Sequence, residues 1–284
     1  MITIGQYYRQ LREVLAKTLP KGEADSAASI VMEDVGGYSR TTLFADGDRK
    51  LSPFMQAKLD TVATKIENGE PVQYAVGRAL FMGNSYTVTP AVLIPRPETA
   101  GLVDMITDRY GSRSDLHVLD IGTGSGCIAI SLARALPFAR IDAVDISEAA
   151  LAVARENAAN LKVRINFEHE DILSAEPPVV PCYDIIVSNP PYVTDSERAD
   201  MDARVLDYEP LSALFVPDSD PLRFYRAIAA YAMKALVPGG SLFFEINQNF
   251  GPQMQQLLAG EGYTDIEILR DFRGNIRYAI ATRP

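Results

Sequence analysis

Histidine and cysteine are scarce in this sequence. Its 284 residues include two histidines, His117 and His169, and two cysteines, Cys127 and Cys182. Neither cysteine belongs to a cluster with the spacing of metal ligands. We therefore expect no metal site and no histidine-based catalytic centre, and the low cysteine count is typical of a reducing compartment.

Long apolar runs are also missing. No run reaches the ~18 residues that a membrane-spanning helix needs. Residues 1–15, MITIGQYYRQLREVL, lack the basic flank and apolar block of a signal peptide. The sequence therefore predicts no membrane partner and a cytoplasmic location.

An excess of basic residues is the third absence. Lys and Arg total 27 against 37 Asp and Glu, which gives a formal net charge of −10. Proteins that bind duplex nucleic acid usually carry a basic surface, because most of their affinity comes from neutralising phosphates. The charge disfavours a nucleic-acid partner, although it does not forbid a local basic groove.

The chain is predicted to begin with a small helical domain at residues 1–72. Apolar side chains recur at helical spacing from Ile4 to Leu15, and Ser52 followed by Pro53 is typical of a helix start. Alternating residues with glycines and prolines predict a hairpin linker at 73–90.

Residues 91–284 alternate between strands and helices. Strands are expected at 117–122, 139–146, 164–172 and 183–189, with helices at 127–136 and 147–160. A helix near 221–236, a turn at 237–240, a strand at 241–246, a helix near 252–260 and a closing hairpin follow. This order predicts an α/β fold with a Rossmann-like, mostly parallel sheet that ends with one antiparallel strand.

A glycine-rich loop, LDIGTGSG at 119–126, follows the first of these strands. Gly122, Gly124 and Gly126 let backbone amides approach a ligand, and the helix that follows favours negative charge. A dinucleotide fingerprint would need glycine where Cys127 stands. The loop, with Thr123 and Ser125, better suits a small ligand that carries a carboxylate, such as the amino-acid end of S-adenosylmethionine; the alternative is a simple tight turn.

Acidic residues end the next two predicted strands. Asp145 follows Gly126 by 19 residues, at the place where an acid can accept both ribose hydroxyls of a nucleoside. Asp171 could accept from an adenine amino group while Ile172 packs on the ring, although a solvated or capping aspartate is the alternative. The loop and Asp145 together predict a nucleoside cofactor.

The fourth strand runs into IVSNPPYV at 186–193. Pro190 and Pro191 stiffen the backbone after Asn189. The Asn189 side-chain carbonyl and the Pro190 backbone carbonyl could accept both hydrogens of an NH2 group, with Tyr192 as a flat surface over a planar substrate. The alternative is a strand that ends in a surface proline turn.

Such an arrangement suits methyl transfer to a poorly nucleophilic nitrogen. The lone pair of an amide or aromatic amine is delocalised into a neighbouring π-system. Holding both hydrogens aims the nitrogen at the methyl carbon of a sulfonium and stabilises the positive charge that develops. No strong base is needed before the attack, in agreement with the absence of a histidine centre.

From about residue 71 to its end, the chain resembles the class I methyltransferases, and more narrowly the glutamine-N5 methyltransferases of peptide chain release factors. The segments that carry this resemblance are PVQYAVGRALFMG, VTPAVLIPRPET, LDIGTGSGCIAISLA, AVDIS, IVSNPPYV, YEPLSALF and RDFRGNIRY. NPPY alone is shared with DNA adenine and other amino methyltransferases, so LIPRPET and EPLSAL make the match specific. Members often read PRPETE, and Ala100 replaces the final Glu here.

The resemblance implies methylation of the glutamine amide in the Gly-Gly-Gln loop of bacterial release factors, with S-adenosylmethionine as donor. Gly122 to Gly126 and Asp145 would hold the cofactor, Asn189 to Tyr192 would hold the glutamine, and Asn189 would also adjoin the cofactor. The amino-terminal helices would grip the release factor. The alternatives are a DNA or RNA amino methyltransferase and a non-catalytic adapter that binds S-adenosylmethionine.

Overall fold

The structure, a computed structural model, describes residues 1–284, which form two compact units. The first unit contains Met1–Arg78 together with Asp202–Tyr208, and the second contains Ala79–Met201 together with Glu209–Pro284. The expected domain limits at residues 72 and 90 stay a prediction. No pattern in the sequence indicated that 202–208 would belong with the amino-terminal helices.

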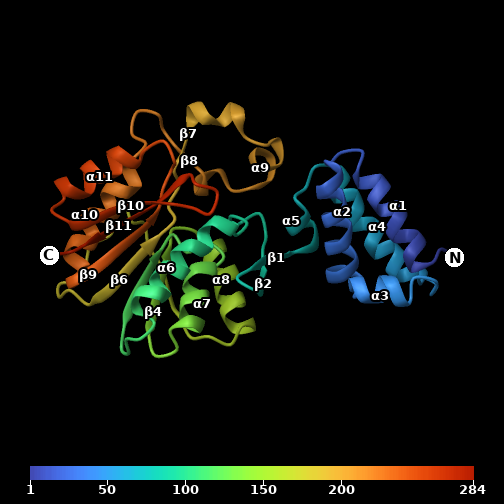
Figure 1. Cartoon of the computed structure of the whole chain (residues 1–284), viewed down its shortest axis with the longest axis horizontal. Helices are drawn as coiled ribbons and strands as arrows, with labels where there is room; N and C mark the ends of the chain where they lie inside the picture. The colour runs from blue at the N-terminus through green and yellow to red at the C-terminus, as the bar shows by residue number, and fades with distance from the viewer. The chain divides into compact units, whose positions relative to one another are not determined.

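The first unit is helical (Figure 1). Its helices are α1 (Ile4–Leu15), α2 (Lys21–Ile30), a π-helical turn (Val31–Val35), α3 (Arg40–Ala45), α4 (Pro53–Glu67), α5 (Val72–Val76) and α9 (Ala203–Tyr208). The predicted start of α4 is confirmed, because the Ser52 hydroxyl accepts a hydrogen bond from the Met55 amide at 3.2 Å. None of the protein's helices combines the length and apolar character that a bilayer crossing requires.

This helical unit has its own hydrophobic core. The core is built from the apolar faces of α1, α2, the π-helical turn and α4, including the fully buried Leu15, Met32 and Leu59. Helix α9 is held by polar contacts within the same unit: Arg204 contacts Glu23 at 2.9 Å, and the Tyr208 hydroxyl donates to the backbone carbonyl of residue 68 at 3.0 Å.

The second unit is built around a seven-stranded sheet. Its strand order is β10-β11-β9-β6-β3-β4-β5. These strands are β3 (His117–Ile121), β4 (Arg140–Asp145), β5 (Asn166–His169), β6 (Tyr183–Ser188), β9 (Leu236–Glu245), β10 (Thr264–Arg270) and β11 (Ile276–Thr282). Strands β1 (Arg78–Phe81) and β2 (Asn84–Thr87) pair with each other within the range expected for the hairpin linker, 73–90, whose first residues belong instead to α5.

Helices cover both faces of this sheet (Figure 1). Helices α6 (Ala100–Tyr110), α7 (Cys127–Ala135) and α8 (Glu148–Asn160) lie on one face, and α10 (Arg223–Ala235) and α11 (Gly251–Gly260) lie on the other. Strand β3 supplies both cores, because Val118 points to the first face and Leu119 and Ile121 to the second. The prediction of an α/β, mostly parallel, Rossmann-like sheet is confirmed.

Three details differ from the sequence-based expectation. The antiparallel strand is β11, and it lies between β9 and β10 instead of at the edge, because it pairs with both. Residues 237–240, expected as a turn, lie within β9, where the register with β6 shifts between Tyr183 and Ile185. Strand β5 is shorter than predicted and covers Asn166–His169.

Candidate active site

A cavity of about 410 Å³ lies at the carboxyl ends of β3, β4 and β6. All of its lining residues belong to the second unit. Because β4 lies on one side of β3 and β6 on the other, this is the point where the strand order reverses. Open α/β sheets bind ligands at such switch points, and the volume lies in the range of roughly 300–1,000 Å³ typical of small-molecule sites.

The glycine loop forms part of the cavity wall. Gly122 and Gly124 line the cavity with φ of +73° and +56°, and a Cβ atom at either would meet nothing within 4 Å. Gly126, with φ of +81°, does not line the cavity. A Cβ atom there would lie 3.0 Å from Ile130 and 3.2 Å from Ala154. The first two glycines therefore keep space for a ligand, and Gly126 permits close packing of α7 on α8.

The two side chains between these glycines both line the cavity. The Thr123 hydroxyl donates to Asp120 Oδ2 at 2.7 Å, and the Ser125 backbone carbonyl accepts from the Asn157 amide at 2.9 Å. Asp120 is fully buried, and its Oδ1 has no hydrogen-bond partner in the protein. Burial raises the Asp120 pKa to about 7.

Asp145 lies at the end of β4 with both carboxylate oxygens held by backbone amides. Oδ2 accepts from Gly124 N at 2.8 Å, and Oδ1 accepts from Ser147 N at 2.9 Å. Burial raises the Asp145 pKa, although these two amides act in the opposite direction. Each oxygen retains a further lone pair, so the carboxylate can still accept a pair of hydroxyl groups.

Asp171 and Ile172 also line the cavity. Asp171 Oδ1 accepts from the Leu173 amide at 3.0 Å. Such a local turn contact is typical of a capping aspartate, the alternative to a role at an adenine. Ile172 packs against the hydrophobic core between the sheet and α10 and α11. Their roles at an adenine ring stay predictions.

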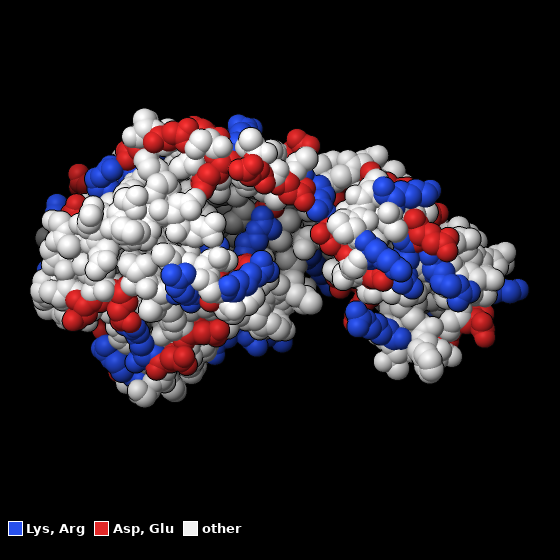
Figure 2. Space-filling view, turned by 45° about the horizontal axis from the view of Figure 1, so that its top comes forward, with Lys and Arg blue, Asp and Glu red and all other residues white.

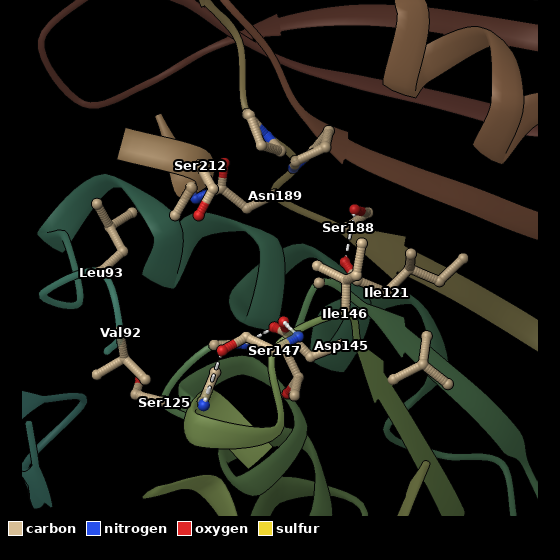
Figure 3. Close-up of a pocket in the computed structure, with 18 of the residues that line it drawn as sticks. Val92, Leu93, Ile121, Ser125, Asp145, Ile146, Ser147, Ser188, Asn189 and Ser212 are labelled. Atoms are coloured by element: carbon tan, nitrogen blue, oxygen red, sulfur yellow. Dashed lines mark hydrogen bonds between the residues drawn. The ribbon is translucent and has the colours of Figure 1, made fainter. Parts of the chain in front are cut away.

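Asn189, Pro190 and Pro191 line the opposite side of the cavity from the glycine loop. In Figure 3, Asn189 lies across the open space from Asp145 and Ser147. The Asn189 side-chain NH2 group donates to Thr99 Oγ1 at 3.3 Å, and its Oδ1 accepts none of the protein's own hydrogen bonds. A free carbonyl acceptor therefore remains available at the cavity.

Tyr192 does not line this cavity. Its ring packs against the hydrophobic core, and its hydroxyl donates to Glu245 Oε1 at 3.1 Å. The amides of Tyr192 and Val193 donate to the Leu214 carbonyl at 3.2 and 2.9 Å, where β7 (Val193–Thr194) pairs with β8 (Phe215–Val216). The predicted surface for a planar substrate stays a prediction, and the contacts present are those that anchor the loop.

Two further residues support the cavity from distant parts of the sequence. Glu209 is buried, and its carboxylate accepts from the Ile94 amide at 3.1 Å and from the Arg96 guanidinium, which lines the cavity. Arg96 belongs to LIPRPET and Glu209 to EPLSAL, so this ion pair joins the two motifs. Those motifs were the only signal in the sequence that could have identified the pair.

The residues around the cavity fit S-adenosylmethionine. The loop at Gly122 and Gly124 leaves backbone space for an amino-acid end, and Asp120 Oδ1 beside it is a buried acceptor without a partner. Asp145 can accept from a ribose diol, while apolar side chains such as Ile172 and Leu93 surround the remaining space. The acidic groups also match the positive charge of this cofactor.

Family models match both parts of the chain. A model described as "PrmC N-terminal domain" matches residues 6–77, and one described as "Methyltransferase small domain" matches residues 99–207.

Curated relatives match nearly the whole length. The chain is 45% identical over 273 residues to a release factor glutamine methyltransferase of Bacteroides thetaiotaomicron, covering 96% of this chain and 98% of the relative. It is 40% identical over 277 residues to a protein of the same name from Flavobacterium psychrophilum, with coverage of 96% and 97%. A solved methyltransferase structure from Pyrococcus furiosus shares the fold, with a TM-score of 0.53 and 16% identity over 78% of this chain and 96% of that one.

Proposed function

The chain belongs to the release factor glutamine methyltransferase family, and from this premise we propose that it methylates the side-chain amide of the glutamine in the Gly-Gly-Gln loop of bacterial peptide chain release factors. The observation that carries this proposal is the free Asn189 Oδ1 at the cavity wall opposite Asp145 (Figure 3). When bound, S-adenosylmethionine supplies an electrophilic methyl group.

The NPPY loop is proposed to hold the glutamine amide. Asn189 Oδ1 and the Pro190 carbonyl would each accept one hydrogen of the NH2 group, which fixes the direction of the nitrogen lone pair. Pro191 keeps Pro190, the residue before it, in an extended conformation. Oriented acceptors of this kind stabilise the positive charge that builds up on nitrogen during transfer.

Cofactor binding is proposed for the opposite wall. Gly122 to Ser125 would receive the amino-acid end, and Asp145 would accept from the ribose hydroxyls. Asp171 and Ile172 would adjoin the adenine, and Asn189 would lie between cofactor and substrate. Gly126 would contribute indirectly, by letting α7 pack close to α8 behind the loop.

The charge distribution supports a protein substrate over duplex nucleic acid. Figure 2 shows Lys and Arg interspersed with Asp and Glu on the visible surface of each unit, without a continuous basic band. The formal net charge of −10 agrees with this distribution. Phosphate neutralisation would need clustered positive charge. We further propose a cytoplasmic location, because release factors act in translation.

The direct test is an intact-mass comparison. Unmodified bacterial release factor and duplex DNA are each incubated with the protein and S-adenosylmethionine. The expected result is a gain of one methyl group on the release factor, at the Gly-Gly-Gln glutamine, and none on DNA. Methylated DNA with unmodified release factor would overturn the proposed substrate.

Asn189→Ala tests the assigned acceptor. Removing the side-chain carbonyl should lower methyl transfer by roughly a hundredfold or more, as for the loss of other preorganised polar groups at reacting centres. Cofactor affinity, measured by calorimetry, should largely survive, because Asp145 and the glycine loop are intact. Full turnover by this variant would contradict the role given to Asn189.

A further inference from the structure

Glu245, at the carboxyl end of β9, is a buried acid just outside the cavity. Its exposed fraction is 1%, and it forms no ion pair within contact distance. Its Oε2 accepts from the Thr99 hydroxyl at 2.7 Å, and its Oε1 accepts from the Tyr192 hydroxyl at 3.1 Å. Burying a carboxylate without a directly paired cation is unfavourable, so the position calls for a functional explanation.

The contact with Thr99 determines which end of the Asn189 amide faces the cavity. A threonine hydroxyl has one hydrogen to donate, and Thr99 gives it to Glu245. Thr99 Oγ1 is therefore left as an acceptor toward Asn189, and an acceptor selects the NH2 group of the amide. Asn189 Oδ1 must then point away from Thr99.

A hydrogen-bond donor at position 245 would reverse the direction of both hydrogen bonds at Thr99. It would donate to Thr99 Oγ1, and the Thr99 hydrogen would be free to turn toward Asn189. A hydroxyl donor selects the amide oxygen, so Asn189 would rotate and present its NH2 group instead. Two NH2 groups facing each other cannot hydrogen bond, and a substrate amide would lose its acceptor.

The same carboxylate also holds the far end of the NPPY loop. Tyr192 donates to Glu245, and the Tyr192 hydroxyl in turn accepts from Arg277 Nη1 at 3.4 Å. The Tyr192 backbone carbonyl accepts from the Asn247 side chain at 3.1 Å. Glu245 thus restrains both Asn189, through Thr99, and Tyr192, directly.

We propose that Glu245 is a positioning residue that acts through Thr99 to keep the carbonyl oxygen of Asn189, and not its NH2 group, directed at the nitrogen to be methylated. The identity of that nitrogen rests on the proposed function, but the orientation of Asn189 does not. Glu245 itself does not line the cavity.

The hydrogen-bonded chain from Glu245 through Thr99 to Asn189, called the relay below, requires ionised Glu245. Methyl transfer should therefore depend on pH. Burial raises the Glu245 pKa and the Glu98 carboxylate acts in the same direction, whereas the hydrogen bond from Thr99, the Arg277 guanidinium and the hydrogen bond from Tyr192 lower it. Protonated Glu245 would be a donor, so methyl transfer should fall as pH decreases through this raised pKa. The other titratable neighbours have raised pKa values and stay neutral in this range; they are Tyr192, Tyr225, Tyr278 and Cys127.

Three variants and a control test the relay in the full-length protein. In Glu245→Gln the amide can donate, in Thr99→Val the hydroxyl is lost at nearly the same volume, and Thr99→Ser keeps the hydroxyl. The control, Asp142→Asn, removes a part-buried carboxylate that contacts His117 and Tyr183 and does not line the cavity.

The kinetic readout is kcat for release factor methylation. Glu245→Gln and Thr99→Val should lose about 10–1,000-fold in kcat, by analogy with the loss of one preorganised group at a reacting centre. Cofactor affinity should be retained, and Thr99→Ser and Asp142→Asn should keep kcat near the wild-type value. The acid limb of the pH profile should be weaker in Glu245→Gln than in wild type by the contribution of Glu245, because Asp120 and Asp145, whose pKa values are also raised, titrate in both proteins. Wild-type kcat in Glu245→Gln, or an unchanged acid limb, would overturn the proposal.

A second readout does not depend on the substrate. Hydrogen exchange of the Asn189 side-chain NH2, followed by NMR, should be slow in wild type and Thr99→Ser, because the group is bonded to Thr99. It should be fast in Glu245→Gln and Thr99→Val. Equal exchange in all variants would overturn the relay even if the wild type methylates release factor. Slow exchange in a wild type that leaves release factor unmodified would instead overturn the proposed function.

Discussion

At the scale of single residues, buried carboxyl groups gather around the strand ends that form the cavity. Asp120 and Glu245 are almost fully buried, and burial raises the pKa of both, as it does for Asp145. Perturbed acids are common at functional sites because desolvation and nearby charge are arranged there for chemistry. Asp120, Asp145 and Glu245 have different hydrogen-bond partners, so substituting each of them should have a different effect.

Asp120→Asn should change how stability depends on pH. The Asp120 pKa is about 7 in the folded protein and should return to its ordinary value near 4 on unfolding. The folded state thus holds this proton more tightly, so its stabilising contribution is complete below about pH 4 and is lost as pH rises to about 7.

The difference in the free energy of unfolding between wild type and Asp120→Asn isolates the contribution of the Asp120 carboxyl group. Over that interval the wild-type free energy of unfolding should fall relative to the variant by up to about 4 kcal/mol. Urea unfolding at several pH values measures it, and acids present in both proteins cancel. Parallel pH curves for the two proteins would contradict a raised Asp120 pKa.

At the scale of elements, the turn from β3 into α7 combines two tasks. Gly122 and Gly124 face open space at the cavity, whereas Gly126 faces Ile130 and Ala154. All three have positive φ, so any substitution there introduces backbone strain. The effect of an added methyl group should nevertheless depend on what it meets.

Gly124→Ala and Gly126→Ala form a matched pair. Both should lose about 1–2 kcal/mol from left-handed backbone strain. Gly126→Ala should lose about 1–3 kcal/mol more, because its Cβ overlaps packed side chains of α7 and α8. Gly124→Ala should instead weaken S-adenosylmethionine binding more strongly, since its methyl group enters the cavity.

Urea unfolding and calorimetric titration separate the two effects. If Gly126→Ala were the weaker cofactor binder and Gly124→Ala the less stable protein, the assignment of packing and binding would be reversed.

Local patterns in the sequence predicted most of the fold but not the contacts that complete the site. The strands from β3 to β6 and their helices followed from periodicity, and the glycine loop followed from residue type. The bond between Thr99 and Glu245 joins residues 146 positions apart, and Arg96 and Glu209 are 113 apart. Such pairs are set by tertiary packing, which no local pattern encodes. The position of β11 between β9 and β10 is likewise set by tertiary packing.

At the scale of the whole molecule, the two units have separate hydrophobic cores. The core around Leu59 contains only residues of the helical unit, and the cores on the two faces of the sheet contain only residues of the other. Cavity and cofactor residues belong to the sheet unit alone. Stability of the helical unit and affinity for the cofactor should therefore be separable.

Leu59→Ala tests this separation. It should destabilise the helical unit by about 2–5 kcal/mol, the usual range for a buried leucine truncated to alanine. Affinity for S-adenosylmethionine should be unchanged, and the cofactor should stabilise only the sheet unit. Scanning calorimetry with and without cofactor measures both effects.

Ile186→Ala, in β6 next to the NPPY loop, is the matched control, and it should weaken both stability and binding. A loss of cofactor affinity in Leu59→Ala as large as in this control would argue against independent cores.

The return of residues 202–208 to the helical unit means that neither unit is one continuous length of polypeptide. The backbone passes from one unit to the other three times, at 78/79, 201/202 and 208/209. After a single protease nick at the first of these junctions, the contacts of Arg204 and Tyr208 in α9 would still connect the amino-terminal helices with the rest of the chain. A chimera that exchanges only residues 1–78 between relatives would combine those helices with α9 of the other protein. Residues 1–78 and 202–208 must therefore be exchanged together.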